Sequence, residues 1–204
     1  MQDKILLIDG HSIANRAFYG LPILTNKDGE YTNAVYGFLN IMLSMIEEEN
    51  PKYVAVAFDL SGPTFRHLQF EDYKGTRKGA PEEFRPQIPL LKEVLDTIKI
   101  KRYEVEGYEA DDILGTLAKK AEGMGLLPVV VSGDRDMLQV TSDKIKLKIP
   151  KTKGGATLVE EYFANDVIEK YGVTPIEYID VKGLMGDPSD NIPGVPGIGE
   201  KTAL

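Results

Sequence analysis

The chain has 204 residues, no cysteine, and 32 acidic against 24 basic side chains, which gives a formal net charge of −8. This length can bury the core of one domain, and the lack of cysteine excludes disulfides and thiolate metal sites. No apolar stretch approaches a membrane span and the N-terminus has no secretory pattern, so a cytoplasmic protein is expected.

In chain order, the first predicted element is a buried strand at 4–8, a short apolar run that ends before Gly10. A helix is predicted from Thr32, which can cap it, to about Glu49, because Asn50-Pro51 stops it. A second apolar strand is predicted at 53–58. Residues 61–85 are rich in glycine, proline and charge without a steady period, which predicts a long, mobile, partly helical connection.

The rest of the chain alternates between helical and strand patterns. Lysines alternate with apolar residues over 144–149, which is typical of an exposed or edge strand rather than of a duplex-binding surface. The alternation predicts a doubly wound, mostly parallel α/β sheet, with ligands beyond the carboxyl ends of its strands. The remaining predicted elements are helix 87–98, strand 100–103, helix 109–123, strand 127–131, helices 165–171 and 175–185, and a tail rich in glycine and proline.

Three of the apolar runs end on an aspartate: Asp9, Asp59 and Asp134. Any one of them could be an ordinary turn residue. If the three strands are parallel, however, their carboxylates gather at one edge of the sheet and repel one another unless a cation lies among them.

Three acid-rich segments add candidate ligands. Acids at 109–112 could instead favour a helix N-terminus, and those at 187–190 an Asx turn. An extended backbone would point Asp134 and Asp136 the same way. All-oxygen ligands suit Mg²⁺ or Mn²⁺, and nine carboxylates suggest two ions about 3.5–4 Å apart. The nine candidates are Asp9, Asp59, Glu109, Asp111, Asp112, Asp134, Asp136, Asp187 and Asp190.

The charge of the chain does not exclude a nucleic-acid partner. Without the nine candidate ligands, the remaining side chains are almost balanced, with 24 basic and 23 acidic residues. Two bound divalent ions would offset part of the negative charge of the site itself. Binding to nucleic acid therefore stays open, although such proteins are usually basic.

Basic residues in 61–85 are candidates for contact with phosphate. Lys74 and Arg77 could close over a phosphate, and a base could stack on Tyr73, although a solvated charged loop is the simpler interpretation. Arg16, seven residues after Asp9, would lie on a helix near the site and could also meet a phosphate. His11 and His67 are expected to be turn or surface residues rather than catalysts.

The segment 194–202 looks like a glycine hairpin between two helices. Glycines let backbone amides approach a phosphate, and the next helix N-terminus favours the anion without reading bases. The alternative is an ordinary glycine turn. The candidate DNA-binding residues of this segment are Gly194, Gly197, Gly199 and Lys201.

Together these motifs resemble the flap-endonuclease family, in particular the N-terminal 5′-nuclease (5′-3′ exonuclease) domains of bacterial DNA polymerases I. The resemblance covers residues 4–204, and its most specific strings lie at 56–59, 108–112, 132–136 and 186–194. It implies a PIN-like core at 1–185, a helical arch at about 61–90, and the start of a helix-hairpin-helix element at 186–204, which would be incomplete at Leu204.

The resemblance also implies roles for the candidate residues. Asp9, Asp59, Glu109 and Asp111 would serve the first metal ion, and the other five carboxylates the second ion or its surroundings. Lys74 and Arg77 would contact the scissile phosphate at the base of the arch, and the hairpin would grip duplex DNA and could hold K⁺. The implied substrates are 5′ flaps, nicked duplexes and RNA-primer ends, in primer removal and DNA repair, with a polymerase domain expected in the intact protein.

Two other functions remain open at this point. A PIN-like ribonuclease could share the acidic edge, but it would need neither the arch nor the hairpin. A non-catalytic module that binds DNA junctions would be indicated by lost metal ligands, and none is lost.

Overall fold

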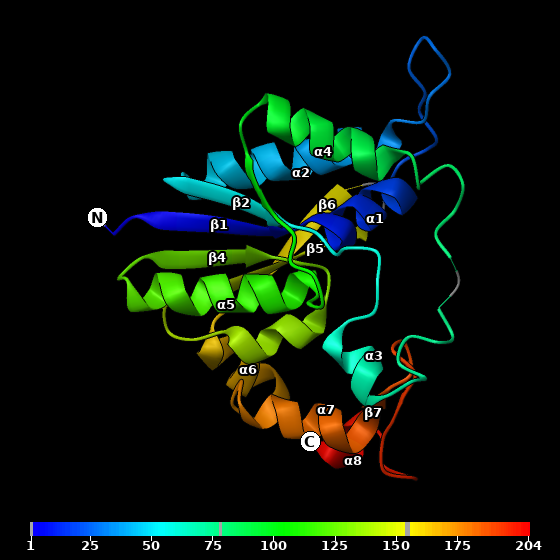
Figure 1. The fold of residues 1–204 in the computed structure, drawn as a ribbon. Coiled ribbons are helices and arrows are strands. Elements are labelled where there is room, and N and C mark those ends of the chain that lie inside the picture. Colours follow the sequence, from blue (N-terminus) through cyan, green and yellow to red (C-terminus); the bar gives the residue numbers. More distant parts are fainter. Residues whose placement is uncertain (1, 78, 154–155) are drawn as a thin grey trace.

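The computed structural model describes residues 2–77, 79–153 and 156–204. Its centre is a six-stranded sheet with helices on both faces, α2 and α4 on one and α5 and α6 on the other (Figure 1). The strands follow the order β3-β2-β1-β4-β5-β6. They are β1 Lys4–Asp9, β2 Tyr53–Ala57, β3 Lys101–Tyr103, β4 Leu127–Val131, β5 Lys146–Lys153 and β6 Ala156–Tyr162.

Strands β1 to β5 pair in parallel and only β6 runs antiparallel, so the predicted mostly parallel α/β fold is confirmed. The order reverses direction between β1 and β4. At such a switch point the connections leave on opposite faces of the sheet, which opens a crevice beyond the carboxyl ends of the strands. The fold thereby creates a ligand site at the ends of β1 and β4.

The helices have the following bounds: α1 Gly10–Gly20, α2 Asn33–Glu49, α3 Phe65–Gln69, α4 Gln87–Thr97, α5 Ala110–Gly123, the 3-10 helix η1 Arg135–Val140, α6 Ala164–Tyr171, α7 Glu177–Met185 and α8 Glu200–Ala203. A short hairpin of β7 Gly186–Asp187 and β8 Ile192–Pro193 lies between the last two. Within the described residues, no helix is both long and apolar enough to cross a bilayer. The predicted connection at 61–85 is indeed partly helical, since it contains α3.

The core follows the two-residue period of the strands. Leu6 and Ile8 face helices α1, α2 and α4, whereas Leu7 between them faces α5 and η1. All three side chains are fully buried. Because both faces of β1 are covered, the strand is apolar from Ile5 to Ile8, and its only acid is Asp9, where the chain leaves the sheet.

The predicted edge strand is wrong in its position. β5 lies between β4 and β6, and no exposed or edge strand over 144–149 exists. The sequence analysis missed β6, which covers the outer side of β5. Lys148 consequently has no exposed surface and lies 2.7–2.8 Å from carboxylates of Glu48, Glu49 and Glu161. Lys146 and Lys148 therefore face acids supplied by α2 and β6 instead of solvent.

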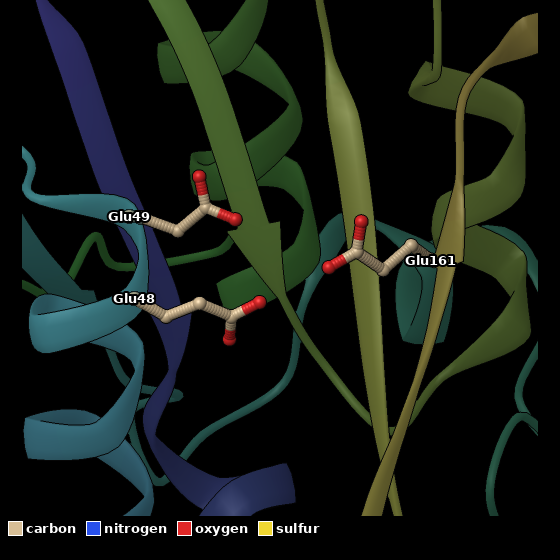
Figure 2. A group of neighbouring side chains, drawn as sticks. All are labelled: Glu48, Glu49 and Glu161. Atoms are coloured by element: carbon tan, nitrogen blue, oxygen red, sulfur yellow. The ribbon is translucent and has the colours of Figure 1, made fainter.

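Figure 2 shows this three-glutamate cluster, formed by Glu48 and Glu49 at the end of α2 and Glu161 on β6. Their carboxylates point into the space between the two elements. Glu49 also pairs with Lys4 at 2.7 Å and with Lys146. The cluster is thus neutralised by lysines, and it ties the last turn of α2 to the outer strands.

Candidate functional site

The candidate site lies at the switch point between β1 and β4. Asp9 ends β1 and caps α1, accepting a hydrogen bond from the Ser12 amide at 2.9 Å. Its other oxygen accepts one from the Ser132 hydroxyl, just after β4, at 2.9 Å. Asp9 is therefore fixed by both strands at the edge where the sequence predicted a carboxylate.

Asp59 follows β2 and reaches the start of α5. Its Oδ1 accepts a hydrogen bond from the Ala110 amide at 2.7 Å. The Asp59 amide donates to His11 Nδ1 at 3.2 Å, so that nitrogen is unprotonated. Burial lowers the pKa of His11, which keeps the ring neutral. His11 acts here as a support for the Asp59 backbone, not as a charged partner of its carboxylate.

Two acids at the start of α5 face the same crevice. Glu109 caps the helix and accepts hydrogen bonds from Lys74 Nζ at 2.7 Å and from the Tyr73 hydroxyl at 3.0 Å. Asp111, in the first turn, has a buried Oδ1 without any hydrogen-bond partner. A buried carboxylate oxygen without a donor is rare, because it loses its hydration without compensation. It is the strongest indication that a cation belongs there.

The four carboxylates of Asp9, Asp59, Asp111 and Asp134, termed the inner carboxylates below, have no lysine or arginine partner within the described part of the chain. Burial, together with repulsion from Asp59 and Asp134, raises the pKa of Asp9 to about 6. Burial and the charges of Asp9 and Asp134 raise the pKa of Asp111 well above its ordinary value. Both carboxylates are thus buried beside other acids without a paired cation, so the residues fit a divalent cation with oxygen ligands.

Asp134 has an extended backbone, but Asp136 lies within the 3-10 helix η1, so the prediction of an extended segment that carries both is wrong. Asp134 caps η1, and its Oδ1 accepts a hydrogen bond from the Asp136 amide at 2.8 Å. Asp136 instead pairs with Lys182 of α7 at 3.0 Å. The 3-10 turn forms because the aspartate can satisfy an amide two residues onward, which turns the chain under the site.

Four further acids, termed the outer acids below, each pair with a lysine or arginine: Asp112, Asp136, Asp187 and Asp190. Lys182 also pairs with Asp187 at 2.8 Å, and Asp187 accepts the Ser189 amide at 2.8 Å in the predicted Asx turn. Burial acts to raise the pKa of Asp187, but Lys182 and Ser189 outweigh it and lower the pKa to about 2. Similarly, Arg66 holds both oxygens of Asp112 at 2.8 Å, and Arg77 pairs with Asp190.

Two adjoining cavities of about 300 and 220 Å³ meet at the site and share Lys74, Glu109, Asp111 and Asp134. Asp9 and Asp59 line the smaller cavity, whereas Asp112, Asp136 and Asp190 line the larger. Across the described ranges, three acids with oxygens all within 4.8 Å of one another occur only in the three-glutamate cluster. Eight of the nine candidates therefore surround a space instead of touching, and the ninth, Asp187, lines neither cavity.

The structure corrects the expectation for Tyr73. Its side chain is 5% exposed, and its hydroxyl donates to Glu109 and to Asp190 at 3.1 Å. A base cannot stack on a ring that is buried in this way. Tyr73 instead anchors the 61–85 segment to the acids, next to Lys74 and Arg77.

Arg16 lies on α1 as predicted, with its guanidinium close to Gly133 and its Nε buried without a hydrogen-bond partner. The glycine segment forms turns around β8 and α8. Gly194 packs so closely on the backbone of Met185 that a Cβ would meet it at 2.3 Å, and Gly197 has a φ of +83°. Gly199 caps the four-residue helix α8, on which Lys201 is exposed.

Comparison with known proteins identifies the family. Residues 4–172 match the model of the 5′-3′ exonuclease N-terminal resolvase-like domain. The chain belongs to this 5′-3′ exonuclease family. Residues 173–204 match the 5′-3′ exonuclease C-terminal SAM fold. The predicted boundary at 185/186 lies one helix further on, after α7, and remains a prediction.

Among curated relatives, DNA polymerase I of Bacillus subtilis is 54% identical over 201 residues, which are 98% of this chain and 23% of the relative. DNA polymerase I of Mycobacterium tuberculosis is 45% identical over 201 residues, again 98% of this chain and 22% of the relative. This exonuclease-family chain thus spans about a quarter of the length of these relatives.

Two solved structures show the same fold. The bacteriophage T5 D15 protein, co-crystallised with metal ions, has a TM-score of 0.78 at 23% identity over 98% of this chain and 72% of its own. The catalytic core of Rad2 in complex with a DNA substrate has a TM-score of 0.62 at 19% identity, over 99% and 60% of the two chains. The predicted PIN-like fold and family resemblance are confirmed.

Sequence reasoning identified Arg77 but missed Arg66 and Lys182, the other two cations that pair with the outer acids of this exonuclease-family site. Arg66 lies on α3 and Lys182 on α7, 46 and 5 residues from Asp112 and Asp187. Lys182 lies in the last turn of α7 and Asp187 just beyond the end of that helix, so the two are close in sequence. For Arg66 no local signal exists, because its partner is set by the way α3 folds over α5.

Proposed function

We propose that the chain is a divalent-metal-dependent, structure-specific 5′ nuclease that hydrolyses DNA at 5′ flaps and 5′ ends by a two-metal-ion mechanism. One observation carries the proposal: the four inner carboxylates line one cavity without a lysine or arginine partner in the described residues, and one Asp111 oxygen has no donor. Such a site is electrostatically incomplete without cations. The exonuclease family and the DNA polymerase I relatives supply the substrate class.

The inner carboxylates and Glu109 would hold Mg²⁺ or Mn²⁺, with Asp136, Asp187 and Asp190 around a second ion. When bound, such ions supply a hydroxide from water and neutralise charge on the in-line transition state. Asp9, fixed by Ser12 and Ser132, and Asp59, fixed by the α5 amide, present their oxygens in a preset arrangement. Asp112 keeps α3 on α5 through Arg66, since both of its oxygens are engaged.

Lys74 and Arg77 would bind the scissile phosphate. In the structure they pair with Glu109 and Asp190 and line the same cavity as the inner carboxylates, which supports this role. A metal bound by Glu109 would leave Lys74 free for that phosphate. Arg16, at Gly133 beside the inner carboxylates, would contact a neighbouring phosphate.

The remaining parts would select the substrate. The 61–90 segment would admit a single-stranded 5′ end, and residues 186–204 would bind duplex backbone through Gly194, Gly197, Gly199 and Lys201, with K⁺ held by backbone carbonyls. Nicked duplexes and RNA-primer ends are the expected partners, in primer removal and repair in the cytoplasm. The length of the DNA polymerase I relatives supports a polymerase domain in the intact protein.

The test is cleavage of a labelled 5′-flap substrate in Mg²⁺, in Mn²⁺ and in EDTA. Cleavage is expected only with a divalent ion, and it should decline as salt weakens phosphate contacts. Asp134→Ala should abolish cleavage while leaving flap binding largely intact, whereas Asp143→Ala, at an exposed acid outside the site, should cut normally. Full activity of Asp134→Ala would refute the assignment, and preferred cleavage of single-stranded RNA would favour a ribonuclease.

A further inference from the structure

An apolar groove of about 280 Å³ adjoins the carboxylate pocket on the far side of Asp112. Its walls are Val105 and Tyr108 from the turn before α5, Ile113 and Leu117 from α5 itself, and Tyr103 of β3. Asp112 and Thr116 line both the groove and the larger site cavity. The two spaces are therefore continuous along one side of α5, and the proposed function assigns nothing to the groove.

Tyr108 is presented to this groove by a rigid turn. Its amide donates to the Val105 carbonyl at 3.2 Å, and Gly107 between them has a φ of +79°, a conformation that favours glycine. The Gly107 carbonyl accepts a hydrogen bond from the Phe65 amide of α3 at 3.0 Å. Tyr108 is nevertheless 52% exposed, so a large aromatic side chain is held in place but left uncovered.

Phe65 supports Tyr108 from α3, with ring centroids 5.8 Å apart and planes inclined by 53°. The guanidinium of Arg66 lies 4.5 Å from the Phe65 ring centroid and binds both oxygens of Asp112. The acid at the junction of groove and pocket is thereby neutralised. A nucleic-acid strand that passes from the groove to the carboxylate pocket would meet an aromatic surface and a paired arginine instead of a free negative charge.

These features match an unpaired nucleobase. A base needs an apolar or aromatic face, and its phosphate needs the cations of the neighbouring pocket, which lies in continuity with the groove. Tyr73, the stacking residue suggested by the sequence, is buried and cannot serve. We propose that the groove holds one unpaired base of the strand whose phosphate lies in the carboxylate pocket, stacked on Tyr108 with Phe65 behind it. This rests on the proposed nuclease function.

The first test places 2-aminopurine at successive positions of the flap strand and binds the full chain in Ca²⁺, which occupies oxygen ligands. We expect one position near the scissile phosphate to be quenched by stacking in the wild type and in Tyr108→Phe. Tyr108→Ala should lose that quenching and bind the flap about 5- to 100-fold more weakly. Tyr36→Ala is the matched control, since Tyr36 is 54% exposed on α2 and lines neither cavity nor groove.

The second test removes the base instead of the tyrosine. An abasic analogue at the quenched position should weaken binding to the wild type and to Tyr36→Ala, but it should leave Tyr108→Ala unchanged. Equal penalties for the abasic flap in all variants would overturn the groove assignment while cleavage by the wild type upheld the nuclease. If the wild type neither bound nor cut flap DNA, both proposals would be refuted.

Discussion

Two groups of clustered carboxylates in this chain differ in how their negative charge is balanced. The three-glutamate cluster of Glu48, Glu49 and Glu161 surrounds the buried ammonium of Lys148, with Lys4 and Lys146 beside it. The inner carboxylates at the carboxyl edge of the sheet surround a cavity and form no ion pair with a lysine or arginine of the described residues, because Lys74 and Arg77, which line the same cavity, pair with Glu109 and Asp190. Close approach of acids is therefore not what distinguishes a metal site.

The pKa values separate the two groups. Burial acts to raise the pKa of Glu49, but the three lysines outweigh it and lower the pKa to about 2. Burial and neighbouring acids raise the pKa of Asp9 to about 6. The charges of the first group are balanced by lysines as the chain folds, whereas no lysine or arginine of the described residues pairs with the second group. Uncompensated charge, not proximity, marks the functional group.

The largest loss of stability should follow from removing an acid of the three-glutamate cluster. Glu49→Ala leaves Lys148 and its neighbours without their most buried partner, and removal of one member of a buried ion pair costs about 3–5 kcal/mol. We expect the melting temperature to fall by about 10 °C for a chain of this size, with or without Mg²⁺. Glu47→Ala is the control, because Glu47 is exposed on the same helix. Equal melting of the two variants would show that the lysines need no buried acid.

Removing the charge of one inner carboxylate should instead raise the stability of the metal-free protein. Asp111→Asn removes one of the mutually repelling buried charges, so it should raise the melting temperature in EDTA by several degrees. The wild type should gain stability from Mg²⁺ because the ion binds only the folded state, and the variant should lose most of that gain. Differential scanning calorimetry in EDTA and in Mg²⁺ measures both. A lower melting temperature for Asp111→Asn in EDTA would mean that its carboxylate is stabilising without metal.

The contributions of the two groups to stability should also change with pH in opposite directions. The pKa of Asp9 is raised from 3.8 to about 6, so its contribution to stability is complete below about pH 4 and is lost as the pH rises through 6. The difference is on the order of 3 kcal/mol in EDTA. The pKa of Glu49 is lowered to about 2, so its contribution is present above pH 4.5 and is lost only in strong acid.

Urea unfolding in EDTA between pH 4 and 8 can resolve the Asp9 window. In Asp9→Asn the unfolding free energy should decline less between pH 4 and 7 than in the wild type. In the wild type, Mg²⁺ should restore at pH 7 the stability that is lost in EDTA. An unchanged decline in Asp9→Asn would assign it to other carboxylates, with Asp111 and Asp136 the next candidates because their pKa values are also raised.

The same comparison explains what could be predicted from the sequence. Asp9, Asp59 and Asp134 were predictable because each follows an apolar run, and parallel strands bring their carboxyl ends to one edge. The location of Lys148 was not, because alternation of lysine with apolar residues is the same in an exposed strand and in one covered by an acidic neighbour. Burial of Tyr73 and the Arg66 pair with Asp112 depend on how the segment 65–73 meets the first turn of α5, which no local pattern encodes.

The smallest effect is expected at Lys151, which lies on β5 only three residues from Lys148 and pairs with Glu160 of β6 at 2.6 Å. The distance resembles those at Lys148, but the Lys151 side chain is 39% exposed, and water already stabilises its charge. Lys151→Ala should therefore lower the unfolding free energy by about 0.5 kcal/mol or less, and the loss should shrink further in high salt. Thermal melts at two salt concentrations test this. If Lys151→Ala were as damaging as Glu49→Ala, burial would not be what makes the lysine contacts of β5 strong.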